Sequence, residues 1–320
     1  MTATPVRGAA APPPVPRDAV VELRAVSHWY GNVVAVNDVS FALRPGITGL
    51  LGPNGAGKST LLHLIAGFLR PSAGTVDAFG EPTWRHPELY RRVGIVQERE
   101  AVYRSLSGRE FVRLNARLHG LADADAATTR AIARVDLATA ADRPTGTYSK
   151  GMKQRIKIAA ATVHDPEVLL LDEPFSGADP RQRLQMMEML REMGAEGRTI
   201  LFSSHILEEM ERLGERVLVI VTGRLAASGD FRAIRRLMTD RPHSFAIQSS
   251  NNRAFAQALL AEPAVRGVEL VDGRLVVRTD DFGRFTVAAP RVARDAAITI
   301  SELYPLDESL ESVFEYLVAR

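Results

Sequence analysis

A glycine-rich segment that contains one lysine is the clearest chemical feature of the sequence. It has glycines at positions 52 and 57 and a Lys-Ser pair directly after the second, which is the P-loop pattern. Glycines let backbone N–H groups surround a chain of phosphates, the lysine neutralises β- and γ-phosphate oxygens, and the serine is placed to bind Mg²⁺. The segment predicts a nucleoside triphosphate site made by Gly52, Pro53, Asn54, Gly55, Ala56, Gly57, Lys58, Ser59 and Thr60.

Two adjacent carboxylates form the second feature, because an apolar run at residues 168–171 ends in Asp172 and Glu173. In P-loop proteins an acid at the end of such a strand holds the metal, which predicts Asp172 as a Mg²⁺ ligand beside Ser59. Glu173 is placed to orient and deprotonate an attacking water, a role that hydrolases need and kinases do not. Alone, the pair also fits a solvated acidic turn. Next to a P-loop it predicts hydrolysis of a bound triphosphate.

The periodicity around these segments predicts an α/β domain. An apolar strand at 47–51 precedes the glycine-rich segment and a helix at 59–69 follows it, which is the context that a P-loop requires. Continuous apolar runs at 168–172, 199–203 and 217–222 are typical of parallel strands buried on both faces. Further strands are expected at 20–23, 33–36, 39–43, 75–79 and 93–96, with mostly helix at 108–163 and a closing helix at 230–238.

The composition is that of an ordinary globular protein and excludes several kinds of site. The 320 residues are 46% hydrophobic and 24% charged, with a formal net charge of +2 at pH 7, which argues against a nucleic-acid-binding protein. The absence of cysteine excludes disulfides, thiolate metal sites and a cysteine nucleophile. No run is long and apolar enough to span a bilayer. The prolines among residues 1–18 predict a disordered tail rather than a signal peptide.

Beyond residue 242 the pattern changes to that of a small α+β domain. Strands are expected at 244–248, 268–271, 275–278 and 298–303, with helices at 253–260 and, more weakly, at 282–294. The order β-α-β-β-α-β is typical of a ferredoxin-like unit. An amphipathic helix is expected at 306–317. The predicted organisation is therefore a tail at 1–18, a nucleotide-binding domain at 19–240 and an accessory domain at 241–320.

The segment Tyr-Ser-Lys-Gly-Met at 148–152 predicts, on its own, a turn in which Ser149 caps a helix that starts near Lys153. Combined with the P-loop and the acidic pair, in this order, it resembles the signature loop of the ATP-binding-cassette (ABC) ATPases. The family's other motifs are matched across residues 20–238 by an aromatic at Tyr30, a Q-loop Gln97, a D-loop Ser176-Gly177-Ala178-Asp179 and a switch histidine in Ser203-Ser204-His205.

This resemblance implies the fold of a P-loop NTPase. The α/β core would be RecA-like, with an antiparallel β subdomain and a helical subdomain at about 98–165. It implies hydrolysis of ATP with Mg²⁺, in which Glu173 is the base, His205 contacts the γ-phosphate, and Gln97 senses metal and water. It also implies a head-to-tail dimer in which the signature loop of one chain meets the ATP held by the other. The ATP-binding residues would then include Tyr30, Ser149, Lys150, Gly151 and Asp179.

Residues 306–314 are similar to the C-terminal motif of bacterial drug-, polysaccharide- and lipid-exporting ABC ATPases. The resemblance therefore implies a cytoplasmic export ATPase on the inner face of the cell membrane, bound to separate transmembrane permease subunits. The second ATP-binding subunit is expected to be another copy of the chain, with a sister subunit as the alternative. A soluble ABC ATPase that acts on nucleic acid or ribosomes is the alternative function. It is disfavoured by the single P-loop, the absence of sustained heptads and the absence of cysteine.

The sequence departs from the family's commonest spelling in the signature loop and in the D-loop. Tyr148, Lys150 and Met152 replace Leu, Gly and Gln of the signature, and Ala178 replaces the usual Leu of the D-loop. The chain has only four lysines among its 40 basic residues, and all four lie in expected ATP-site elements. One is the P-loop lysine. For the other three, Lys150, Lys153 and Lys157, we hypothesise a position on the dimer face.

Overall fold

The computed structural model describes residues 18–99, 102–230, 243–271 and 273–306. The chain divides into two units, Met1–Ser228 and Gly229–Arg320, each with its own hydrophobic core. The expected tail at 1–18 and the expected helices at 230–238 and 306–317 fall almost entirely outside the described residues. The same holds for the C-terminal motif at 306–314.

The first unit is built on a six-stranded sheet whose strand order brings the chemical motifs to one edge. Strand β3 (Gly46–Leu51) pairs in parallel with β8 (Thr199–Ser204) and with β9 (Arg216–Val221). On the other side of β8 lie β7 (Val168–Asp172) and then β6 (Val93–Val96), and β10 (Arg224–Gly229) lies beside β9. Strands β3, β7 and β8 are buried along their whole length, as continuous apolar runs predict.

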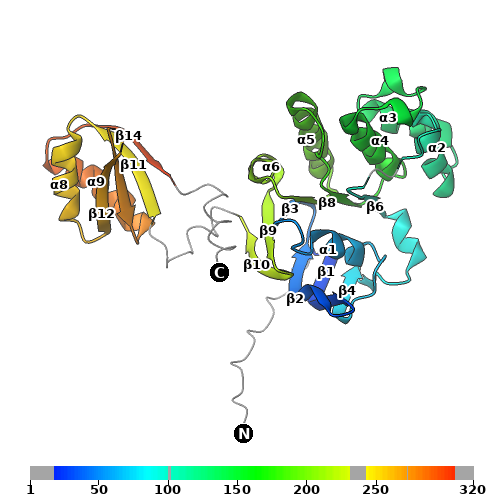
Figure 1. Cartoon of the computed structure of the whole chain (residues 1–320), viewed down its shortest axis with the longest axis horizontal. Coiled ribbons are helices and arrows are strands. Elements are labelled where there is room, and N and C mark those ends of the chain that lie inside the picture. The colour runs from blue at the N-terminus through cyan, green and yellow to red at the C-terminus, as the bar shows by residue number, and fades with distance from the viewer. Residues whose placement is uncertain (1–17, 100–101, 231–242, 272, 307–320) are drawn as a thin grey trace, which may run out of the picture. The chain divides into compact units, whose positions relative to one another are not determined.

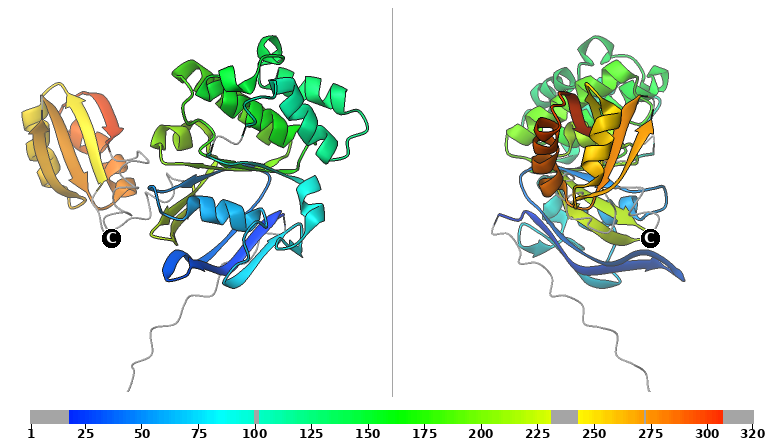
Figure 2. Two further views of the ribbon diagram at one scale, coloured as in Figure 1. Left: turned by 45° about the vertical axis from the view of Figure 1, so that its right-hand side comes forward. Right: turned by 90° about the vertical axis from the view of Figure 1, so that its left-hand side faces the viewer.

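Helix α1 (Lys58–Ile65) lies between this sheet and a second, antiparallel sheet (Figure 2). The second sheet has the order β2-β1-β4-β5 and contains β1 (Val21–Tyr30), β2 (Val33–Leu43), β4 (Ala73–Ala78) and β5 (Glu81–Pro82). Apolar side chains from α1 and from both sheets share one core. Helices α5 (Pro180–Ala195) and α6 (Leu207–Leu213) pack on β3 and β8 from the opposite face.

A group of helices follows β6, as the sequence predicts for residues 108–163. It contains α2 (Gly108–Leu118), α3 (Ala124–Arg134) and α4 (Lys150–Thr162), which pack on one another. Short 3₁₀ turns occur at Pro87–Arg91, Ala138–Ala140 and Thr145–Thr147. Helix α4 also contacts β6, so the group is joined to the sheet at the strand that ends in the Q-loop.

The second unit has the ferredoxin-like topology that its pattern predicts. Its antiparallel sheet has the order β12-β13-β11-β14, formed by β11 (His243–Ser249), β12 (Val265–Val271), β13 (Arg274–Thr279) and β14 (Ile300–Pro305). Helices α8 (Asn252–Leu260) and α9 (Phe282–Asp295) pack against it around Phe245, Phe255 and Phe285. Figure 1 shows this unit in yellow to red.

Several expected boundaries are wrong, each for a local reason. The strands expected at 33–36 and 39–43 are one strand, because an irregular register and a positive φ at Asp38 let β2 continue through the gap. The helix expected at 59–69 ends at Ile65, since Gly67 adopts φ +71° directly after the cap residue Ala66. Helix α4 starts at Lys150, immediately after its cap Ser149, rather than near Lys153.

Pro290 lowers the helical signal of residues 282–294, yet α9 runs through it as one helix. The burial of Phe285, Ala288 and Ala289 on the same helix compensates for the lost backbone donor. Among the described residues, none of the helices combines the length and apolar character that crossing a bilayer would require.

Candidate functional site

The P-loop wraps around a buried lysine at the carboxyl end of β3. Gly55 and Gly57 have φ values of +80° and +102°, which glycine adopts without the steric cost of a Cβ atom. A Cβ atom on Gly57 would also collide with the carbonyl oxygen of Ala35 in β2. The loop therefore depends on glycine for both its backbone conformation and its close packing. It leads directly into the first turn of α1, whose N-terminal N–H groups favour an anion.

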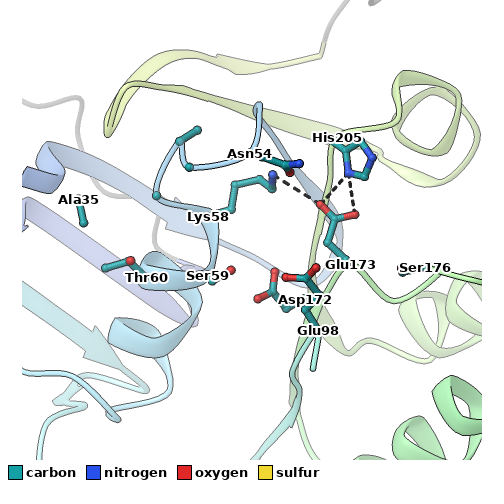
Figure 3. Close-up of a pocket in the computed structure, with 13 residues that line it drawn as sticks. Ala35, Asn54, Lys58, Ser59, Thr60, Glu98, Asp172, Glu173, Ser176 and His205 are labelled. Atoms are coloured by element: carbon teal, nitrogen blue, oxygen red, sulfur yellow. Dashed lines mark hydrogen bonds and ion pairs between the residues drawn. The ribbon is translucent and has the colours of Figure 1, made fainter. Parts of the chain in front are cut away.

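The Lys58 ammonium lies inside this loop. Its Nζ atom donates hydrogen bonds to the carbonyl oxygens of Gly52 at 2.7 Å and Pro53 at 3.3 Å. It also lies 3.5 Å from Oε1 of Glu173, with which it forms a buried ion pair (Figure 3). The ammonium is thus held at the base of the loop, in the position where a compact positive charge neutralises phosphate oxygens.

Ser203, at the end of β8, positions both acidic residues at the end of β7. Its hydroxyl donates a hydrogen bond of 2.6 Å to Oδ1 of Asp172 and accepts one of 3.0 Å from the backbone N–H of Glu173. Glu173 has a φ of +48°, a conformation that costs energy for a residue with a Cβ atom. The Ser203 hydroxyl therefore stabilises a strained backbone at which the chain turns the Glu173 carboxylate toward the P-loop.

His205 faces the same carboxylate from the segment that follows β8. Its Nδ1 atom lies 3.1 Å from each oxygen of Glu173 (Figure 3). The next turn of chain is held by Glu209 of α6, which accepts a 2.5 Å hydrogen bond from the Ser204 hydroxyl. Burial raises the pKa of Glu209, and the Ser204 hydrogen bond and the nearby Arg183 partly oppose that shift.

These residues surround a cavity of about 340 Å³. Its lining combines positive and negative groups from the ends of β3 and β7, with Ser59 and Asp172 both facing it. A hydroxyl and a carboxylate are the hard oxygen ligands that Mg²⁺ takes together with substrate phosphates, so the residues fit that ion. The lining residues are Ala35, Asn54, Gly55, Ala56, Gly57, Lys58, Ser59, Thr60, Glu98, Asp172, Glu173, Ser176 and His205.

The remaining predicted site residues do not line this cavity. Gly52 and Pro53 lie behind it, where their carbonyl groups hold Lys58. Tyr30 is half exposed at the end of β1, edge-on to His28 with ring centroids 4.7 Å apart. Gln97 is exposed just after β6. Their roles in binding ATP or metal stay predictions.

The signature and D-loop residues form a patch on the surface of the first unit that is separate from the cavity. Ser149 is exposed, and its hydroxyl accepts the backbone N–H of Met152 as the N-cap of α4. Asp179 caps α5 by accepting the N–H of Gln182 at 2.8 Å. A Cβ atom on Gly151 would meet the end of the Gln182 side chain, so the starts of the two helices pack closely here.

Two of the departures from the family's common spelling, Tyr148 and Lys150, are accommodated by packing in this part of the surface. Tyr148 is buried, and its hydroxyl donates a 2.6 Å hydrogen bond to the carbonyl of Ala140. Burial raises the pKa of Tyr148. The Lys150 stem packs so closely on Gly177 of the D-loop that a Cβ atom there would lie 2.8 Å from the Lys150 Cβ. Lys150 is itself exposed, whereas the proposed position of Lys157 on the dimer face is wrong, because that side chain is buried.

Four residues lie at or behind the cavity to which the sequence assigned no role of their own there. Ala35 and Glu98 line it from β2 and from the Q-loop, and Ser176 lines it from the start of the D-loop. Ser203 lies behind it and organises the acidic pair. Glu98 and Ser176 adjoin recognised motifs, which is a signal that could have identified them. Ala35 lines the cavity from a strand of the other sheet.

The parallel sheet, the P-loop at its edge and the carboxylates on the adjoining strand define the first unit as a P-loop nucleoside triphosphatase. Comparison with known proteins narrows the class. A family model described as "ABC transporter" matches residues 36–176. The Nod factor export ATP-binding protein I of Burkholderia orbicola is 40% identical over 215 residues, which are 66% of this chain and 71% of that protein.

A solved structure of the ATP-binding subunit of an ABC transporter superposes with a TM-score of 0.63. It is 32% identical, and the match covers 68% of this chain and 92% of that one. A dimeric bacterial ABC transporter cassette, 22% identical, shares the fold with a TM-score of 0.61 over 66% of this chain and 98% of its own. The chain belongs to the ABC transporter ATP-binding proteins, and it is an ATP-binding subunit and an ATPase that uses Mg²⁺.

Proposed function

We propose that the chain drives export as a head-to-tail dimer, with two ATP molecules bound between the subunits. The observation that carries this proposal is the position of Ser149 and Gly151. Ser149 is the exposed N-cap of α4, and Gly151 is buried in the first turn of that helix. Neither residue lines the cavity that holds Lys58, Glu173 and His205. A helix N-terminus with a free surface binds anions well, so in a dimer it would meet the γ-phosphate of the ATP in the partner's cavity.

The residues around the cavity support a hydrolysis mechanism in which Glu173 is the base. Its carboxylate takes one proton from a water molecule, and the water oxygen forms a bond to the γ-phosphorus. The bond from that phosphorus to the β,γ-bridging oxygen breaks, and ADP leaves with the electron pair. Lys58 neutralises charge on the phosphates, and His205, 3.1 Å from both Glu173 oxygens, keeps the base oriented. Ser59 and Asp172 would hold Mg²⁺, which supplies positive charge to the phosphate oxygens.

In the proposed dimer, Tyr30 stacks on the adenine, and Asn54, Ala56 and Thr60 complete the phosphate-binding loop. Gln97 contacts metal and water, while Lys150 and Asp179 border the partner's nucleotide. Tyr30 and Gln97 are both exposed next to the cavity-forming elements, which supports these roles. The population of closed and open dimers then depends on whether ATP or ADP is bound.

Export rather than import is supported by the relatives. Those from Burkholderia and from Sinorhizobium fredii are both called Nod factor export ATP-binding proteins. The proposed partners are transmembrane permease subunits and a second copy of this chain, on the cytoplasmic face of the membrane. Three exposed apolar side chains on or next to α2, Tyr103, Leu114 and Leu118, support a contact with cytoplasmic helices of a permease. We propose that the accessory domain at 241–320 supports or regulates the dimer.

The variant Glu173→Gln tests the dimer. It keeps the shape of the side chain but cannot take a proton, so it should bind ATP, lose nearly all hydrolysis and accumulate as an ATP-bound dimer. Light scattering after size-exclusion chromatography, with ATP and with ADP, measures the mass. Glu192→Gln on the exposed face of α5 is the matched control. A Glu173→Gln protein that stays monomeric with ATP, or hydrolyses ATP at the parent rate, would contradict the proposal.

The permease partner is tested by co-expression with membrane proteins encoded next to this chain's gene. We expect a complex that survives purification in detergent and in which the ATPase rate responds to the membrane subunit. Purification with ribosomes or DNA instead would favour the alternative function.

A further inference from the structure

Lys157 connects the signature helix to the Q-loop through polar contacts. Its side chain is 6% exposed, and its Nζ atom donates hydrogen bonds to the backbone carbonyls of Gln97 at 2.7 Å and Arg99 at 3.1 Å. A longer contact of 3.4 Å reaches the carbonyl of Glu98 between them. One ammonium on α4 thus contacts three consecutive residues of the Q-loop, which lie 58 to 60 residues earlier in the chain.

The chemistry of the lysine side chain suits this place. Burying an ammonium is costly unless its N–H groups are satisfied. Moving the Q-loop away from Lys157 would leave the buried charge without its hydrogen bonds, so the charge holds the two elements together. An ammonium offers three donors from one point, which matches carbonyl groups that converge on it. A guanidinium presents its donors in a flat fork and matches such carbonyls less well.

A second buried side chain on α4 is hydrogen-bonded to the residue that follows β7. Nε2 of Gln154 donates a 3.0 Å hydrogen bond to the carbonyl of Glu173, the residue with the positive φ. Gln154 and Lys157 are three residues apart and share one face of the helix. Helix α4 is therefore tied through one face to the catalytic carboxylate's backbone and to the Q-loop, while its N-terminus carries Ser149.

We propose that Lys157 is a positioning residue for ATP hydrolysis, which holds the Q-loop in a defined place relative to the signature helix. Through this tie, a displacement of α4 reaches Gln97 and Glu98 at the chain's own ATP site. Since Ser149 belongs to the partner's site in the proposed dimer, the same tie links the two sites. The inference about hydrolysis rests on the proposed function, but the hydrogen bonds between Lys157 and the Q-loop do not.

Hydrogen–deuterium exchange on the full chain tests the tie without reference to activity. The variant Lys157→Met keeps the length of the stem and removes all three donors. We expect faster exchange in peptides that contain residues 97–99, with P-loop peptides unchanged. Arg130→Met, which removes an exposed charge from α3 in the same helical group, is the control and should leave the Q-loop unchanged. Unchanged Q-loop exchange in Lys157→Met would overturn the proposal.

Steady-state kinetics test the consequence for hydrolysis. We expect Lys157→Met to lower kcat on the order of tenfold, while the dissociation constant of a fluorescent ATP analogue stays within about twofold. Lys157→Arg, which keeps the charge, should lie between the parent and Lys157→Met, and it also serves if the methionine variant is poorly folded. An unchanged kcat despite faster Q-loop exchange would overturn the catalytic part of the proposal.

A double-mutant cycle separates positioning from general damage. If Lys157 acts through the Q-loop, Lys157→Met should cost less than about twofold in kcat when Gln97 is already alanine, because the two changes remove the same contribution. A merely structural role would instead give two independent losses. Multiplicative losses in the double variant would therefore refute the proposal, even if the proposed dimer is correct.

Discussion

Ser203→Ala should damage the protein more than any conservative surface change, because one hydroxyl serves two buried groups. Ser203 is fully buried, and its hydroxyl donates to Oδ1 of Asp172 at 2.6 Å and accepts the N–H of Glu173 at 3.0 Å. Alanine removes both hydrogen bonds and puts nothing in their place. The Asp172 carboxylate and the Glu173 backbone N–H would then each lose a fully buried hydrogen-bond partner.

The expected loss follows from the two bonds. A hydrogen bond to a charged group contributes about 1.5–3 kcal/mol and a neutral one about 0.5–1.5 kcal/mol, so the free energy of unfolding should fall by about 2–4.5 kcal/mol. Activity should fall as well, because the N–H bond holds Glu173 at its φ of +48° and thereby aims the carboxylate. We expect kcat to drop by at least about tenfold, which corresponds to about 1.4 kcal/mol.

Urea unfolding followed by tryptophan fluorescence is a suitable assay. Both tryptophans, Trp29 and Trp84, lie in the first unit, so the signal reports on the unit that contains the site. The control Ser105→Ala removes an exposed hydroxyl of the same unit and should change stability by less than about 0.5 kcal/mol. If Ser203→Ala also stays within that range, with kcat unchanged, the assigned role of Ser203 is refuted.

Three further predictions concern the P-loop, the signature loop and a histidine pair. Gly57→Ala should abolish ATP binding in titration calorimetry, because a Cβ atom there meets the carbonyl of Ala35 and φ is +102°; retained affinity would contradict the close packing. Tyr148→Phe removes the hydrogen bond to Ala140 and should lower the free energy of unfolding by about 1 kcal/mol, measured as for Ser203→Ala. A loss within the error of the unfolding curves would mean that this hydrogen bond contributes nothing. Burial and the stacked ring of His119 lower the pKa of His164 from 6.5 to about 4. Between these two pH values the unfolded chain binds a proton that the folded chain does not, so stability falls as the pH decreases, by at most about 1.4 kcal/mol per unit. His164→Leu should flatten this part of a stability–pH curve, and an equally steep curve would refute the assignment.

Local patterns predicted much of the fold, because their causes are local. The continuous apolar runs at 168–172 and 199–203 correspond to the parallel strands β7 and β8, since strands covered on both faces must be apolar throughout. The β-α-β-β-α-β order at the C-terminus corresponds to the ferredoxin-like sheet. Helices α5 and α6 and strand β10 were not expected.

Boundaries were predicted less well than elements, because they depend on single backbone conformations. Asp38 at φ +53° allows β2 to continue where two strands were expected, and Gly67 at φ +71° ends α1 early. Pro290 suggested a break in α9 that packing of its buried face prevents. In these cases the outcome depends on a backbone angle or on the packing of a buried face, and periodicity does not contain that information.

By itself, the sequence determined the chemistry of this protein. The glycines, Lys58 and Ser59 indicate phosphate binding together with the strand before them and the helix after them, and all of these signals are local in the chain. Only the tertiary structure decided which distant groups complete it. Strand β8 lies between β3 and β7, which brings Ser203 to Asp172 and His205 to Glu173. The tertiary structure also places Lys157 in the interior of the first unit, against the Q-loop, where the sequence suggested a position on a dimer face. Burial and hydrogen bonding between segments far apart in sequence are properties of the packed chain, and no local pattern encodes them.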